Sequence, residues 1–84
     1  MSYACRGIAR DVKGEFEAAV LDYSKAIEID PQYGEAYANR GLLLLRLGRL
    51  SEADRDFEYS LRLEPKLKEP LTVRIDKVKR KNVR

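Results

Sequence analysis

The sequence contains no histidine, a single cysteine and no apolar run longer than Leu42 to Leu45. Cys5 cannot form an internal disulfide, which favours a reducing compartment. The apolar runs are too short for a membrane span, and no charged and apolar signal segment opens the chain. We therefore expect a soluble, cytoplasmic protein without a membrane span.

Features of catalytic and cofactor sites are equally scarce. There is no glycine-rich phosphate loop, and Cys5 has no histidine to activate it as a nucleophile, so we interpret it as a small packing residue. The acidic residues lie on the polar faces of the expected helices, where we interpret them as solvated: Glu15, Glu17, Asp22, Glu28, Asp54, Asp56 and Glu58. We predict no enzyme, no metal and no cofactor.

Positive charge is concentrated at one end of the chain. Residues 66–84 carry eight Lys and Arg against two acids, a net charge of +6, whereas the whole chain carries +3. Residues 1–65 must therefore sum to −3. Such asymmetry indicates either an anionic partner or a solvated terminal segment.

Two segments of the chain repeat one another with a period of 34 residues, the distance from Gly7 to Gly41. The same offset relates Tyr37 to Tyr3, Gly48 to Gly14, Ala53 to Ala19, Phe57 to Tyr23, Leu61 and Leu63 to Ile27 and Ile29, and Pro65 to Pro31. A fixed period of this length is typical of stacked repeat arrays.

Each repeat predicts two helices. Apolar residues recur at helical spacing in four segments, residues 3–12, 16–29, 34–47 and 51–63. Gly14 and Gly48 are expected to end the first and third helices, and Pro31 and Pro65 follow the other two. Ser51 is predicted to be an N-cap. The short connections favour antiparallel helical hairpins.

A fifth helix over residues 68–82 differs in kind. Leu71, Ile75 and Val78 form a narrow apolar stripe, so this helix is expected to pack on one side only and to cap the stack. Basic residues surround the stripe: Arg74, Lys77, Lys79, Arg80 and Lys81. We divide the single domain into repeat 1 (1–33), repeat 2 (34–67) and a basic capping helix (68–84).

These residues carry a family resemblance. The second unit reads Tyr37, Arg40-Gly41, Leu44, Ala53, Phe57 and Pro65, and the first reads Tyr3, Arg6-Gly7, Arg10, Ala19, Tyr23 and Pro31. Over nearly its whole length the chain resembles two tetratricopeptide (TPR) repeats. Both units depart from the pattern by having arginine where leucine is usual. The resemblance implies an all-α fold of two antiparallel helix-turn-helix repeats, stacked as an α-solenoid under the capping helix.

The resemblance also implies a function, a protein-interaction module or scaffold that holds a peptide or a helix in a concave groove. The groove residues it implies are Ile8, Val12, Tyr33, Ala38, Asn39, Leu42, Leu45 and Arg46. The four consecutive leucines sweep around the helix, and we expect Leu43 and Leu44 to point into the stack. Leu42 and Leu45 either form an exposed groove, which binds a partner or a second copy of the chain, or are covered by the capping helix or a neighbouring chain segment.

Asn39 has a second interpretation within the family, as one residue of a clamp for a terminal carboxylate. The other clamp positions hold Ala4, Ile8, Thr72 and Asp76, which supply no cation. We therefore interpret Asn39 as an ordinary residue of the repeat.

The basic helix supports an alternative function, an adaptor that recruits an acidic protein or another anionic partner. Nucleic acid is disfavoured because no aromatic residue follows Tyr59 to stack on bases. The simpler interpretation is a solvated outer face. Because two repeats are fewer than such arrays normally need, the chain is either a fragment of a longer array or a homo-oligomer that pairs or swaps helices.

Overall fold

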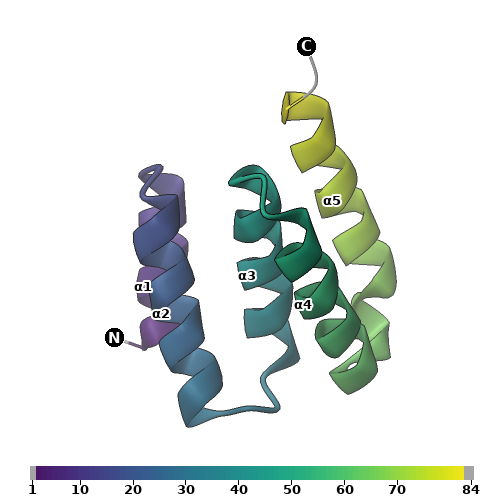
Figure 1. Ribbon diagram of the computed structural model, residues 1–84. Coiled ribbons are helices and arrows are strands. Elements are labelled where there is room, and N and C mark those ends of the chain that lie inside the picture. The colour runs from purple at the N-terminus through teal and green to yellow at the C-terminus, as the bar shows by residue number, and fades with distance from the viewer. Residues whose placement is uncertain (1, 83–84) are drawn as a thin grey trace.

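A computed structural model describes the backbone of residues 2–82 and the side chains of residues 2–80 (Figure 1). Its elements are α1 (Tyr3–Val12), α2 (Phe16–Ile29), α3 (Gly34–Arg46), α4 (Leu50–Leu63), the short 3₁₀ helix η1 (Pro65–Leu67) and α5 (Lys68–Asn82). The all-α prediction with five helices is confirmed. Within the described residues, no helix is long and apolar enough to cross a membrane.

The turns inside the two hairpins are built alike. Gly14 and Gly48 have φ values of +83° and +81°, in the left-handed region that glycine adopts without steric strain. Each glycine N–H and the next N–H donate to carbonyls of the last helical turn: Gly14 to Asp11, Glu15 to Arg10, Gly48 to Leu45 and Arg49 to Leu44. This Schellman arrangement ends α1 and α3 and reverses the chain.

The predicted N-cap at Ser51 is wrong. Helix α4 begins at Leu50, Arg49 occupies the cap position, and no side-chain cap bond forms there. Because the turn at Gly48 leaves only one residue before the helix, Ser51 already lies within the first helical turn. A side-chain cap does occur at α1, where the Ser2 hydroxyl accepts a hydrogen bond from the Cys5 N–H at 3.1 Å.

Helix α3 is the centre of the fold, because it contacts α2, α4 and α5 (Figure 1). Leu43 packs into one apolar cluster with Tyr23 and the alanines of α1 and α2. Leu42, Leu44 and Leu45 pack into a second cluster with Phe57 and α5. The four leucines therefore face neighbours on several sides, which explains how a continuous apolar run fits one helix.

Close approach within each hairpin depends on the repeated glycine of the first helix. A Cβ added at Gly41 would lie 2.6 Å from a ring carbon of Phe57. A Cβ added at Gly7 would lie 3.0 Å from a ring carbon of Tyr23. The aromatic residue of the second helix thus fills the space that the missing side chain leaves.

Ser60 is a polar residue in the apolar interior of repeat 2. It is fully buried, and its hydroxyl has no hydrogen-bond partner among the described residues. Ala26 occupies the equivalent place in repeat 1. We expect Ser60→Ala to raise the free energy of unfolding by about 1 kcal/mol, because an unsatisfied buried hydroxyl is removed. Urea denaturation measures this, with the exposed Ser51→Ala as control, and a loss of stability at Ser60 would contradict it.

Candidate functional site

The two arginines that depart from the family pattern form ion pairs within their own repeats. The Arg6 guanidinium donates to Asp22 at 2.9 Å, and Arg40 donates to both oxygens of Asp56 at 2.8 Å. Both carboxylates are buried, so the interpretation of Asp22 and Asp56 as solvated was wrong. The signal was present in the sequence, since Arg6 with Arg40 and Asp22 with Asp56 obey the same 34-residue period.

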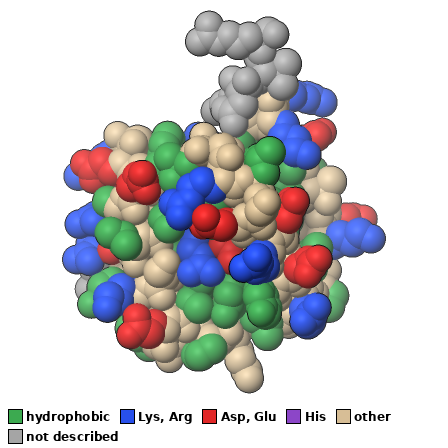
Figure 2. All heavy atoms as spheres, in the orientation of Figure 1, with side chains coloured by type: hydrophobic (Ala, Val, Ile, Leu, Met, Phe, Trp, Pro, Cys, Tyr) green, Lys and Arg blue, Asp and Glu red, His purple; other side chains and the backbone are tan. Residues whose placement is uncertain are grey.

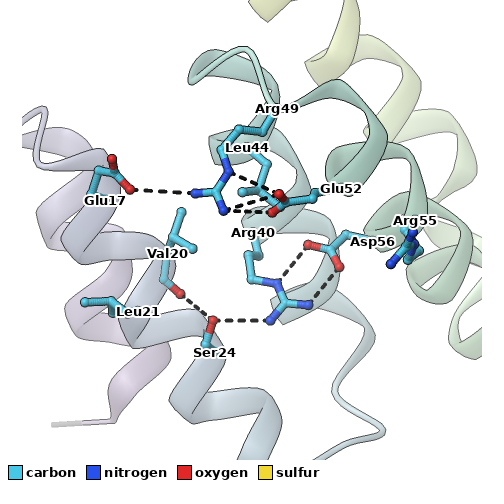
Figure 3. A pocket seen from close by; sticks show the side chains of 10 residues that line it. All are labelled: Glu17, Val20, Leu21, Ser24, Arg40, Leu44, Arg49, Glu52, Arg55 and Asp56. Carbon is cyan, nitrogen blue, oxygen red and sulfur yellow. Dashed lines mark hydrogen bonds and ion pairs between the residues drawn. The ribbon is translucent and has the colours of Figure 1, made fainter.

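Arg40 also joins the two repeats. Its Nη1 donates to the Ser24 hydroxyl of α2 at 3.2 Å, and that hydroxyl donates to the Val20 carbonyl (Figure 3). Hydrogen bonds from Arg40 to Asp56 raise the pKa of the guanidinium, so Arg40 stays charged. Arg49 makes a further contact between the repeats, in which its Nη1 lies 3.7 Å from Oε1 of Glu17.

Around these contacts lies an open hollow of about 760 Å³ between α2 and α4. Val20 and Leu44 line it together with the Arg40–Asp56 pair (Figure 3). Figure 2 shows the molecular face on this side, where charged side chains of both signs are interspersed with apolar ones. The acids and arginines that line the hollow balance in number, so it shows no preference for a charged ligand.

Three of the predicted groove residues are covered. Ala38, Leu42 and Leu45 of α3 are buried in the cluster that contains Leu71 and Val78 of α5. The expected exposed groove is therefore not present on repeat 2. Of the two alternatives for the leucines, coverage by the capping helix is the one that the structure contains.

The groove residues of α1 are open. The exposed fraction is 51% for Ile8 and 83% for Val12. Tyr33 is half-buried at the start of α3 and lines one hollow together with Tyr3. Arg46 is exposed and its guanidinium lies over the Phe16 ring, 5.5 Å from the ring centre.

Asn39 lies where α3 meets α5. Its side-chain oxygen accepts a hydrogen bond from Arg74 of α5 at 2.9 Å. The pKa of Tyr23 is raised to about 12, first by burial and then by the negative charge of Asp11, while Arg74 acts to lower it. Helices α3 and α5 are joined here by the hydrogen bond between Arg74 and Asn39.

The predicted basic patch remains largely on the outside of α5. Lys77, Lys79 and Arg80 are exposed, and Arg80 lies 3.8 Å from Asp76. Arg74 differs because of its contact with Asn39. Lys81 belongs to the helix, but its side chain lies outside the described residues. No group of three acidic, cysteine or histidine residues in the described chain could hold a metal ion.

Comparison with known proteins supports the repeat assignment. A TPR repeat family model matches residues 13–48, and a tetratricopeptide repeat model matches residues 34–67. An uncharacterized protein of Methanocaldococcus jannaschii is 38% identical over 65 residues, which are 77% of this chain and 76% of that protein. No solved structure matches significantly.

Longer relatives match through a small part of their length. DnaJ homolog subfamily C member 3 of Rattus norvegicus is 40% identical over 52 residues, 62% of this chain but 10% of that protein. Tetratricopeptide repeat protein 6 of Homo sapiens is 32% identical over 60 residues, 71% of this chain and 12% of that protein. The fold is that of a protein–protein interaction module, and the chain belongs to the tetratricopeptide repeat family.

Proposed function

We propose that the chain holds a segment of another protein on the surface formed by α1, α3 and α5, which we call the concave surface. It comprises Ile8 and Val12 of α1, Asn39 and Arg46 of α3, and Arg74 of α5. The observation that carries the proposal is the exposure of Ile8 and Val12. Two neighbouring apolar side chains on one helix face supply a contact for apolar residues of a partner.

The charges around this surface suggest the chemistry of the partner. Arg46 and Arg74 are exposed cations on α3 and α5, and Lys77 lies one turn beyond Arg74. Asp11 is the acidic residue of α1. A partner segment that places apolar residues on α1 and carboxylates toward α5 would satisfy both features. The partner is thus an apolar and acidic peptide or helix.

The double substitution Ile8→Lys with Val12→Lys tests the surface. Short peptides selected on the natural chain from a phage-displayed random library serve as the probe, and we expect them to combine apolar and acidic residues. Losing the apolar contact should weaken their binding about tenfold or more, because burying such a side chain contributes about 1.5–3 kcal/mol. Both positions are exposed, so the helix content and the denaturation midpoint should not change. Fluorescence anisotropy measures the affinity.

Leu21→Lys is the matched control, since Leu21 is also exposed, at 66%, but lies beside the hollow of α2 and α4. It should bind the peptides as the natural chain does. Unchanged binding by the Ile8 and Val12 variant would contradict the proposal. If binding were instead lost with Lys77→Glu and Lys79→Glu, and fell steeply with salt, the partner would occupy the basic face of α5 alone.

A further inference from the structure

Helix α5 is attached to the rest of the fold mainly through α3. Leu71, Ile75 and Val78 supply its apolar contacts at the spacing of one helix face, and Leu71 and Val78 are buried. They cover Ala38, Leu42 and Leu45 of α3. Among the side chains that the structure describes, one hydrogen bond accompanies this packing, from Arg74 to Asn39. α5 therefore binds α3 as an amphipathic helix binds a groove.

The two sides of this contact differ in how they tolerate water. The remainder of α5 is mostly polar and exposed, so the helix is compatible with solvent when it is separated from α3. The covered face of α3 is not, because separation would expose Leu42, Leu45 and Ala38 together. The apolar face of α3 must therefore be covered by a helix. By contrast, α5 can pack equally well on the α3 of another copy of the chain.

The connection to α4 is short and can act as a hinge. Only Glu64 and η1 (Pro65–Leu67) lie between α4 and α5, and Glu64 has an extended backbone with φ −139° and ψ 85°. Pro65 prevents α4 from continuing smoothly into α5, because it has no N–H for the helix ladder. Rotations at these few residues would redirect α5 and leave the helices of both repeats in place, although Leu67 would have to leave its packing against the core.

We propose that two copies of this chain exchange their α5 helices, so that α5 of each covers α3 of the other. Every contact of the exchanged helix is one that the single chain already makes, including that of Arg74 with Asn39. Only the hinge conformation and the protein concentration distinguish the two forms, the condition under which domain swapping occurs. Each copy then contributes Arg74 to the concave surface of its partner. The inference does not depend on the proposed peptide-binding function.

The test uses full-length variants that each carry one cysteine, in a Cys5→Ser background. An Asn39→Cys chain and an Arg74→Cys chain are mixed at high concentration, incubated, diluted and treated with a short bismaleimide cross-linker. Because each chain has a single thiol, a link between positions 39 and 74 joins different chains. We expect this link to increase with the concentration during incubation and to persist after dilution, as determined by mass spectrometry of the cross-linked peptides.

Two controls make the result decisive. Asp76→Cys in place of Arg74→Cys puts the thiol about 200° around the same helix, and it should give only the background of random collisions. A single chain with both Asn39→Cys and Arg74→Cys should close internally at low concentration, which shows that α5 is seated on α3. The exchange would be ruled out if the chain with both cysteines cross-linked internally, but the link between positions 39 and 74 of different chains formed no more often than the link to Asp76→Cys. Failure of internal closure would also overturn it, because α5 would then not occupy α3.

Discussion

Replacing Asp56 by alanine is expected to lower the free energy of unfolding by about 3–5 kcal/mol. The carboxylate is buried and binds Arg40 through two hydrogen bonds of 2.8 Å. Its loss leaves the guanidinium, whose side chain is only 23% exposed, without its anion inside the repeat interface. A chain of this size has a total stability of about 4–13 kcal/mol, so the variant should be close to unfolding. Urea denaturation followed by circular dichroism measures the change.

Asp22→Ala is the matched comparison, because Asp22 lies at the equivalent position of repeat 1. Asp22 pairs with Arg10, at 3.4 Å, as well as with Arg6. Its loss should still be less harmful, since the side chains of Arg6 and Arg10 are 48% and 35% exposed and water can solvate both guanidinium groups. Adding Arg40→Leu to Asp56→Ala should recover part of the lost stability, because the uncompensated buried charge is then removed. Equal losses for Asp22→Ala and Asp56→Ala would show that burial of the arginine does not set the cost.

The second large effect is expected from Leu42→Lys combined with Leu45→Lys. Both leucines lie beneath α5, and replacing large buried apolar side chains by charged ones should cost about 5 kcal/mol or more in total. We therefore expect loss of α5 from α3, and at ambient temperature partial or complete unfolding. If the two leucines instead lined an exposed groove, the same substitutions would leave the helices intact.

Circular dichroism and protection of α5 amides from hydrogen exchange distinguish these outcomes. Ile8→Lys with Val12→Lys is the matched control, because the substituted positions lie on the equivalent face of α1 and are open to water. Native helix content and a native denaturation midpoint in the Leu42 and Leu45 variant would mean that α5 does not cover α3 in solution.

The helical framework could be predicted from the sequence because each of its elements depends on local chemistry. Gly14 and Gly48 mark the turns, since a left-handed residue there needs no side chain. The period from Gly7 to Gly41 then identifies the repeated hairpin, and the aromatic residues Tyr23 and Phe57 identify its packing. Errors at this level were small, such as the cap assigned to Ser51.

The residues that line the proposed binding surface were harder to predict, because the exposure of a side chain depends on which elements pack beside its helix. Ile8 and Leu42 occupy equivalent places in the two repeats, yet Ile8 is half exposed and Leu42 is buried. The difference arises from α5, which packs on α3, while no helix of the described chain covers the equivalent face of α1 in the same way. Nothing local to the leucine run distinguishes these cases.

The sequence by itself determined the family, the number of helices and the places where they turn, because these follow from periodicity and from glycine and proline chemistry. Only the tertiary structure decided which polar residues are buried and which apolar residues are open. Asp22 and Asp56 are buried since a guanidinium from the neighbouring helix reaches each of them. Leu42 and Leu45 are covered because an amphipathic helix more than twenty residues further along the chain packs on them. Such contacts between distant segments depend on how the helices are placed in space.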